Sequence, residues 1–271
     1  MDETNRAVIT LTTDFGWRDP YVGIMKGVIL GLAPGASIID LTHGISSHNV
    51  LEAALVLECS YRYFPEGTIH LVVVDPGVGT ERRPLLATTG RYSFVGPDNG
   101  VFSPVLSRES PYRIYHLTKQ RYFLDRLSST FHGRDIFAPV AAWLFQGASP
   151  AQMGEEISSM VELRIPEVKQ VACNLWAARV LRVDRFGNLI TNIGRPEFET
   201  VLEPRTSFQV RFGQHTVTRL RESYGVAPSG EIFAIWGSSG WLEISSNQAS
   251  AAELMGVREN QEFTIEILST P

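Results

Sequence analysis

The chain has 271 residues, of which 44% are hydrophobic and 20% charged, a composition typical of a globular protein with one or two domains. No apolar run reaches the roughly 18 residues needed to cross a bilayer, so the sequence does not predict a membrane protein. The formal net charge of −5 argues against a nucleic-acid-binding protein, because such proteins concentrate Lys and Arg on one face.

The cysteine content and the start of the chain bear on its compartment. Neither Cys59 nor Cys173 belongs to a CxxC pair or to a metal-ligand pattern. Residues 1–6 lack the basic start and apolar core of an export signal. We therefore expect a cytoplasmic protein that binds neither membrane nor nucleic acid. Its partner is expected to be a small molecule or another copy of the chain.

The first part of the chain alternates between strand-like and helix-like patterns. Residues 8–12 are short, β-branched and apolar, and they run into Thr13-Asp14-Phe15-Gly16, where the predicted strand ends. From Tyr21 to Leu32, apolar residues recur at spacings of three and four, and Pro34-Gly35 then ends the pattern. This spacing predicts a helix directly after the first strand.

The alternation continues up to about residue 160. Residues 69–74 are apolar on both faces, as expected of a central parallel strand. Asp135 is the expected N-cap of a helix over residues 136–146, with Pro139 in its first turn. The other predicted elements are strands at residues 37–41, 85–88 and 92–95 and a helix at residues 49–63. Together they predict a layered α/β domain with a largely parallel sheet.

The second part of the chain has a different pattern, of brief β-rich runs separated by turn residues. Such spacing without intervening helices predicts a small antiparallel barrel or sandwich. We therefore expect an α/β domain over residues 1–166 and a β-barrel domain over residues 172–271. The predicted strands are residues 177–183, 207–212, 215–220, 231–236, 241–244 and 262–268.

Two acids follow predicted strands of the first domain. In open parallel sheets, ligands bind outside the carboxyl ends of the strands, where Asp14 and Asp75 are expected to face one crevice. A carboxylate there can accept both hydroxyl hydrogens of a ribose diol. Alternatively, each acid only caps a turn or a helix, which for a single strand-end Asp is about as frequent.

Arg82 and His132 are further candidates. The Gly77-Val78-Gly79 turn lacks the third glycine of a dinucleotide-binding loop, and Arg82 stands at that position, so the loop either binds an anion or is a solvated surface loop. His132 precedes a predicted helix, whose dipole favours the neutral ring and hence proton acceptance. A structural, hydrogen-bonded His is the commoner case. A metal site built from His132, Asp135 and Asp75 has weaker support, because the spacing is poor.

Two polar turns of the second domain could contact a ligand or simply close hairpins. They are residues 184–188 and 238–240. In the first turn, the amide of Asn188 suits the edge of an adenine, and Phe186 offers a stacking or packing face.

Five segments, taken together and in this order, resemble the S-adenosylmethionine hydroxide adenosyltransferases, which are relatives of the bacterial fluorinase and chlorinase. The match extends over nearly the whole chain. The segments are residues 12–16, 74–80, 95–100, 131–135 and 186–188.

The resemblance implies an N-terminal α/β domain and a C-terminal β-barrel. It further implies a homotrimer in which the substrate lies between the N-terminal domain of one subunit and the C-terminal domain of its neighbour. The implied reaction is hydrolysis of S-adenosylmethionine to adenosine and methionine, by in-line attack of an activated water on ribose C5′, without metal or cofactor.

The resemblance also implies residue roles. Asp75, Arg82 and His132 correspond to the water-activating group of the family, and Asp14 to the acid that binds the ribose diol. The implied methionine contacts are Asp19, Asp184, Ser238 and Ser239, and Asn188 and Phe186 are the candidates for the adenine side. A halogenase is disfavoured, because this chain lacks a hydroxyl-lined halide pocket. A non-catalytic binding module and a metal-dependent hydrolase are the remaining alternatives.

Overall fold

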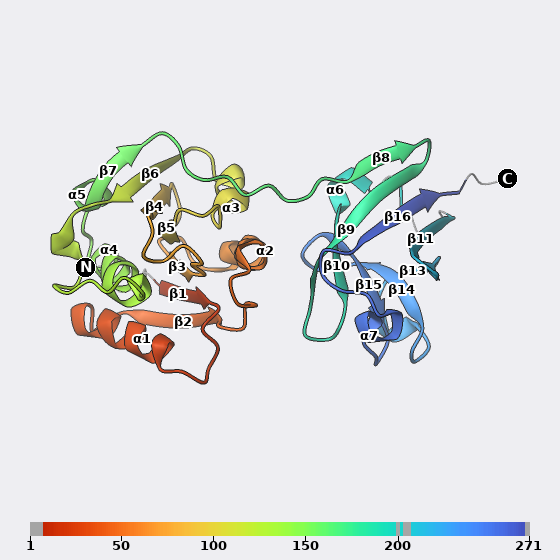
Figure 1. Cartoon of the computed structure of the whole chain (residues 1–271), viewed down its shortest axis with the longest axis horizontal. Helices are drawn as coiled ribbons and strands as arrows, with labels where there is room; N and C mark the ends of the chain where they lie inside the picture. The colour runs from red at the N-terminus through yellow and green to blue at the C-terminus, as the bar shows by residue number, and fades with distance from the viewer. Residues whose placement is uncertain (1–7, 199–200, 203–206, 269–271) are drawn as a thin grey trace. The chain divides into compact units, whose positions relative to one another are not determined.

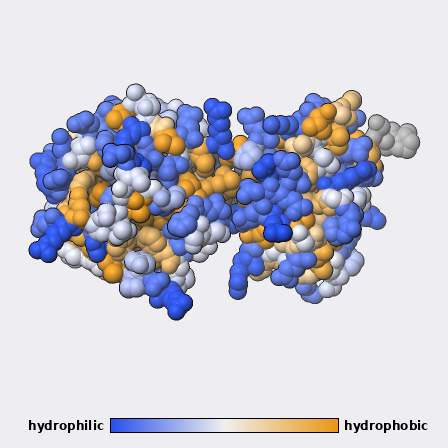
Figure 2. Space-filling view, in the orientation of Figure 1, coloured by the Kyte–Doolittle hydropathy of each residue, from blue (hydrophilic) through white to orange (hydrophobic). Residues whose placement is uncertain are grey.

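The computed structural model describes residues 8–198, 201–202 and 207–268 of the chain. The chain divides between Arg164 and Ile165 into two compact units, each with a hydrophobic core of its own (Figure 1). Hydrophilic and hydrophobic residues alternate over the visible surface of both units (Figure 2). In the described ranges, no helix is long and apolar enough to cross a membrane.

The first unit is built on a seven-stranded sheet with the strand order β2-β1-β3-β5-β4-β6-β7. The first four strands in this order are parallel, whereas the pairs β5/β4, β4/β6 and β6/β7 are antiparallel. The strands are β1 (Val8–Thr13), β2 (Ser37–Thr42), β3 (Ile69–Val73), β4 (Pro84–Thr89), β5 (Ser93–Pro97), β6 (Tyr112–Leu117) and β7 (Gly154–Ile157).

The expectation of a largely parallel sheet therefore holds only for half of the sheet. The amide of Thr89 donates to the carbonyl of Tyr92 at 2.9 Å and closes a tight turn between β4 and β5. A parallel connection needs a crossover of a dozen residues or more, so strands joined by so short a turn must pair antiparallel.

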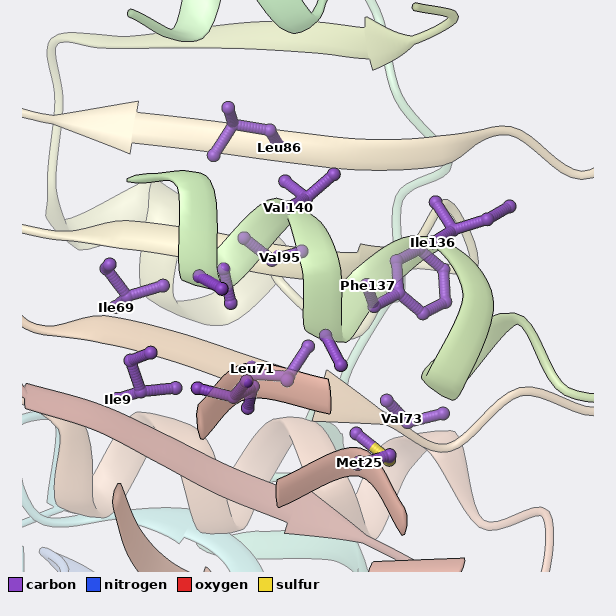
Figure 3. Close-up of a cluster of buried hydrophobic side chains, with 14 of the residues drawn as sticks. Ile9, Met25, Ile69, Leu71, Val73, Leu86, Val95, Ile136, Phe137 and Val140 are labelled. Carbon is purple, nitrogen blue, oxygen red and sulfur yellow. The ribbon is translucent and has the colours of Figure 1, made fainter. Parts of the chain in front are cut away.

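Helices cover both faces of the parallel part of the sheet. Helices α1 (Tyr21–Leu32) and α4 (Ala138–Phe145) share a core cluster with Leu71 and Val73 of β3 (Figure 3). Helices α2 (Val50–Ser60) and α3 (Ser103–Arg108) pack with Val72 on the opposite face. The central position predicted for this strand is confirmed, since both its faces are buried.

The predicted N-cap at Asp135 is wrong. A π-helical turn, η3 (Gly133–Phe137), precedes α4, so the helical segment begins before Asp135 and His132 takes the cap position. The fully buried Asp135 carboxylate instead accepts a hydrogen bond from the amide of Ser128 at 2.6 Å and pairs with Arg134 at 2.5 Å. These two partners draw the side chain away from the helix start. A further short helix, α5 (Pro150–Met153), leads into β7.

The second unit is a curled, mainly antiparallel sheet in the order β12-β11-β16-β9-β10-β15-β14-β13, with β8 pairing with β9 (Figure 1). Only β13 and β14 pair in parallel among its described strands. The run predicted as one strand at residues 215–220 forms two strands. The elements are β8 (Lys169–Ala172), β9 (Leu175–Val183), β10 (Leu189–Gly194), α6 (Arg195–Phe198), β11 (Phe208–Phe212), β12 (His215–Val217), β13 (Leu220–Arg221), β14 (Ile232–Trp236), β15 (Trp241–Ser246), α7 (Ala251–Met255) and β16 (Glu262–Ile267).

Candidate active site

A cavity of about 290 Å³ lies at the carboxyl ends of β1 and β3 in the first unit. These strands are parallel neighbours, with Thr13 in register with Val73, so the acids that follow them emerge side by side. Asp14 and Asp75 both line the cavity, together with His132. The structure therefore brings three of the residues singled out in the sequence around one hollow.

Arg82 connects Asp75 to His132. Its Nε donates to both carboxylate oxygens of Asp75, at 2.9 and 3.0 Å, and its Nη2 also contacts Asp75 Oδ2. The same Nη2 lies 2.8 Å from Nδ1 of His132. The Phe137 ring, whose centroid is 5.2 Å from the guanidinium carbon, packs against the other side of the cation. Arg82 is not among the residues that line the cavity, so it supports Asp75 and His132 from behind.

The hydrogen bonds fix where the proton of His132 resides. An arginine can only donate, so Nδ1 of His132 must accept from Arg82, and a neutral ring then carries its hydrogen on Nε2. Burial, and next the positive charge of Arg82, lower the pKa of His132. His132 is therefore a neutral hydrogen-bond donor at Nε2, whereas the Asp75 carboxylate remains an acceptor.

Gly79 allows the loop that carries Asp75 and Arg82 to lie close to the His132 segment. Its φ is +78°, and a Cβ at this position would lie 2.3 Å from the carbonyl oxygen of Ser129. Any other L-residue would meet both the strained backbone and this contact. Of the two alternatives for this loop, the surface-loop interpretation does not fit so close a packing.

Asp14 is held by the loop that follows β2. Its Oδ2 accepts a hydrogen bond from the backbone amide of His48 at 2.9 Å. His48 has a φ of +67°, a conformation that non-glycine residues adopt only where the surroundings impose it. Ser47 and His48 line the cavity beside Asp14, and neither was singled out in the sequence. The polar run Ser46-Ser47-His48-Asn49 after a predicted strand was the signal that could have indicated them.

An aromatic group forms the apolar part of the cavity wall. Phe15, Tyr21 and Phe131 all line the cavity, and their ring centroids lie 5.2 to 5.9 Å apart. They come from the loop after β1, the start of α1 and the segment before η3, so no sequence pattern joined them. Such a wall can contact the apolar part of a ligand while the acids bind its polar groups.

Asp19 lies outside this cavity. It is exposed in the turn that precedes α1 and is not a lining residue.

The candidate residues of the second unit lie in two turns. Between β9 and β10, the Asp184 carboxylate accepts hydrogen bonds from the amides of Phe186 and Asn188 at 2.8 and 2.9 Å and from the Asn188 side chain at 2.8 Å. These bonds close the turn and leave the Phe186 side chain 77% exposed. Ser238 and Ser239 lie in the turn between β14 and β15.

An acidic group that the sequence analysis missed lies next to these turns. Glu243 on β15 is buried and accepts a hydrogen bond from the Tyr224 hydroxyl at 2.9 Å. Burial raises the pKa of Glu243 despite this bond, and the charge of Asp184 raises it further. An acid inside the apolar run Trp241-Leu242-Glu243-Ile244 was the available signal.

The described ranges hold no group of three or more His, Cys, Asp or Glu side chains placed to share a metal ion.

Comparisons with known proteins match both units. The family model for the SAM hydroxide adenosyltransferase N-terminal domain matches residues 9–154, and the model for the C-terminal domain of that family matches residues 178–264. A solved structure of an uncharacterized conserved protein from Thermotoga maritima superposes with a TM-score of 0.88 at 35% identity, covering 95% of this chain and 99% of that one.

Several relatives have named activities. The (R)-S-adenosyl-L-methionine hydrolase of Thermus thermophilus is 37% identical to this chain, and the match covers 91% of this chain and 94% of that protein. The hydrolase of the same name from Methanocaldococcus jannaschii is also 37% identical, and the match covers 95% of each chain. A fluorinase of Nocardia brasiliensis is 25% identical, over 93% of this chain and 95% of its own length.

Proposed function

Because this chain belongs to the SAM hydroxide adenosyltransferase family, we propose that it hydrolyses S-adenosyl-L-methionine to adenosine and L-methionine. The observation that carries the proposal is the Asp75–Arg82–His132 group at a cavity that Asp14 also lines. The relatives' names specify the R form of the substrate. The configuration at the sulfonium was not foreseen from the sequence.

The chemistry of a sulfonium fits such a site. The oxygen of a water molecule attacks C5′ of the ribose, the bond from C5′ to sulfur breaks, and its electron pair neutralises the sulfur of the departing methionine. A neutral thioether leaves without protonation, so the reaction needs neither a general acid nor a Lewis acid at the leaving group. The demand on the site is to align the water and to accept its proton.

The positions of the hydrogen-bond donors and acceptors at the site support separate roles for Asp75, Arg82 and His132. Asp75 receives the proton of the attacking water, and the Nε2 hydrogen of neutral His132 orients the water oxygen. Arg82 orients the Asp75 carboxylate and holds the His132 tautomer. Orientation contributes about 7 to 11 kcal/mol in well-aligned systems, and proton transfer to a positioned base about 3 to 5 kcal/mol.

The substrate contacts belong to the same proposal. Asp14 accepts the hydroxyl hydrogens of the ribose diol, since its carboxylate lies beside Asp75 at the strand ends. The family resemblance supports Asp19, Asp184, Ser238 and Ser239 as methionine contacts and Asn188 and Phe186 as adenine contacts.

We extend the proposal to the assembly and the compartment. The family resemblance supports a homotrimer and a closed β-barrel in the second unit, and β12 lies close to β14 as barrel closure requires. The low cysteine content supports a cytoplasmic location.

The deciding experiment is incubation of chelator-treated protein with each sulfonium epimer of S-adenosylmethionine in ¹⁸O-labelled water. The expected products are methionine and adenosine with the label at the 5′ hydroxyl, from the R epimer. Tight retention of unchanged substrate would instead make the protein a binding module. Activity that disappears with the chelator and returns with a divalent cation would make it a metal-dependent hydrolase.

A further inference from the structure

A partly buried series of interacting polar side chains leads to the Asp14 loop and takes no part in the proposed chemistry. It connects α1, β2 and β1, which lie side by side (Figure 1). Lys26 Nζ donates to Asp40 Oδ2 at 2.6 Å, and Oδ1 of Asp40 lies 3.0 Å from Nε2 of His43. On the other side of its ring, Nδ1 of His43 lies 2.8 Å from the Thr13 hydroxyl. The side chain of His43 is fully buried.

The hydrogen bonds indicate donor and acceptor roles for Thr13 and His43. The Thr13 hydroxyl oxygen already accepts the amide hydrogen of Phe15 at 3.2 Å, so its own hydrogen is available for Nδ1 of His43. The ring hydrogen of His43 then resides on Nε2, which lies 3.0 Å from Oδ1 of Asp40. Burial alone would raise the pKa of Asp40, but its contacts with Lys26 and His43 lower it, so the carboxylate stays ionised.

The two residues that follow Asp14 are both hydrogen-bonded to members of this series. The amide of Phe15 donates to Thr13, and the amide of Gly16 donates to the carbonyl of His43 at 2.8 Å. The loop that carries Asp14 is therefore held by His43 through a side-chain and a backbone contact. Once these bonds form, little backbone freedom is left at Asp14.

We propose that Thr13 and His43 are positioning residues, which hold the Asp14 carboxylate where it binds the ribose diol of the nucleoside substrate. This inference rests on the proposed function. The residues touch no reacting atom, and they act only through Asp14. Their loss should therefore weaken ground-state binding and transition-state binding alike, which raises KM and leaves kcat nearly unchanged.

The same strand offers a matched control. Thr10 on β1 also forms a fully buried hydroxyl–imidazole pair, with its Oγ1 2.8 Å from Nδ1 of His70. Thr10 lies three residues before Thr13, so its side chain faces the opposite side of the sheet, and its hydrogen bond is made to His70 of β3 rather than to His43. Thr10→Val and Thr13→Val each remove one fully buried hydroxyl that is hydrogen-bonded to a histidine ring, so they should cost similar stability.

The test compares Thr13→Val, Thr13→Ser and Thr10→Val in the full chain. We measure kcat and KM for S-adenosylmethionine, Kd for adenosine, and amide hydrogen exchange at Phe15 and Gly16. Thr13→Val should raise KM and Kd by about five- to tenfold, the effect of one lost hydrogen bond, with kcat within about threefold of wild type. Thr13→Ser should restore both constants, and Thr10→Val should leave them unchanged.

A double variant tests whether the effect passes through Asp14. In the Asp14→Ala background, Thr13→Val should add nothing further to Kd, because the carboxylate that it positions is gone. Independent, multiplying effects in the double variant would overturn the inference, as would equal Kd values for Thr13→Val and Thr10→Val. If wild-type protein neither binds adenosine nor turns over substrate, the proposed function fails. In that case, faster exchange at Phe15 and Gly16 in Thr13→Val alone still supports the positioning role, and unchanged exchange refutes it.

Discussion

The Arg82 guanidinium hydrogen-bonds to both Asp75 and His132, so its substitution affects both groups at once. Arg82→Ala leaves the buried Asp75 carboxylate without its cation and His132 without the donor that fixes its tautomer. We expect kcat to fall by about 10²- to 10⁴-fold, while Kd for substrate changes by less than about threefold. Rapid-quench turnover and equilibrium binding measure the two quantities separately.

Arg83 provides the control for this substitution. It is the next residue along the chain, and its Nε donates to the buried Asp98 carboxylate at 2.7 Å. Arg83→Ala also breaks a buried ion pair but does not touch Asp75 or His132. An equal loss of kcat in both variants would show that the effect of Arg82→Ala is one of folding.

The direction of the His132 pKa shift leads to a pH prediction. Since burial and the charge of Arg82 lower the pKa of His132 from its ordinary value of 6.5, the ring is mainly neutral at pH 6.5. We therefore expect kcat to remain level as the pH falls through 6.5, and its acidic limb to lie below that value. A kcat–pH profile measures the position of this acidic limb.

Two variants assign the acidic limb to a residue. Asp75→Asn keeps the shape of the side chain but cannot accept a proton, so it should lose turnover by about 10²- to 10⁴-fold at every pH. His132→Gln should retain more activity than Asp75→Asn and should keep the acidic limb. An acidic limb that disappears in His132→Gln would identify the imidazole as the base.

Among single residues, the sequence indicated the acids and the histidine but not the way they are connected. Asp14 and Asp75 were predictable because they follow strands whose carboxyl ends meet at one edge. That Arg82 lies behind the cavity depends on the path of a loop around Gly79, which no local pattern encodes. Asp135 was placed wrongly, because its hydrogen bond with the Ser128 amide and its ion pair with Arg134 outweigh its tendency to cap a helix.

At the scale of elements, the Gly79 loop gives the sharpest prediction. Gly79→Ala places a methyl group 2.3 Å from the Ser129 carbonyl oxygen, so the loop must move away from the His132 segment. This displacement should lower kcat by more than about tenfold, because catalytic groups tolerate little misplacement. Gly213→Ala, at φ +57° with open space around it, has the same backbone cost without the contact. A similar loss of kcat in Gly213→Ala would contradict this explanation.

Elements with a regular apolar period were predictable, and those that depend on distant partners were not. The spacing of three and four located α1 at its observed bounds, and β3 is apolar on both faces because helices cover both sides. In contrast, β6 and β10 were not predicted. Both strands contain polar residues within an otherwise apolar pattern. In β10 these are the buried Thr191 and Asn192, which hydrogen-bond to backbone atoms far away in the sequence.

At the scale of the whole molecule, His70 links stability to pH. Burial lowers its pKa to about 3, so between pH 3 and 6.5 the unfolded chain binds more protons than the folded chain. The contribution of His70 is fully present above pH 6.5 and is lost as the pH falls. The free energy of unfolding should therefore decrease by up to about 1.4 kcal/mol per pH unit from this group. Denaturant unfolding of wild type and His70→Phe at pH 7 and pH 5 should show a smaller pH dependence in the variant, and equal dependences would refute the assignment.

Mixing two inactive variants distinguishes a site shared between subunits of the proposed trimer from a site built within one subunit. Arg82→Ala removes a member of the proposed water-activating group of the first unit, and Phe186→Ala removes the proposed adenine contact of the second. The exposed Phe186 side chain can be removed without affecting the core. Each variant alone should be nearly inactive. If the site joins the first unit of one subunit to the second unit of its neighbour, co-expression in equal amounts should restore about a quarter of the wild-type sites, since each half is intact in one of two subunits. Activity that stays at the level of the single variants would place both halves of the site in the same subunit.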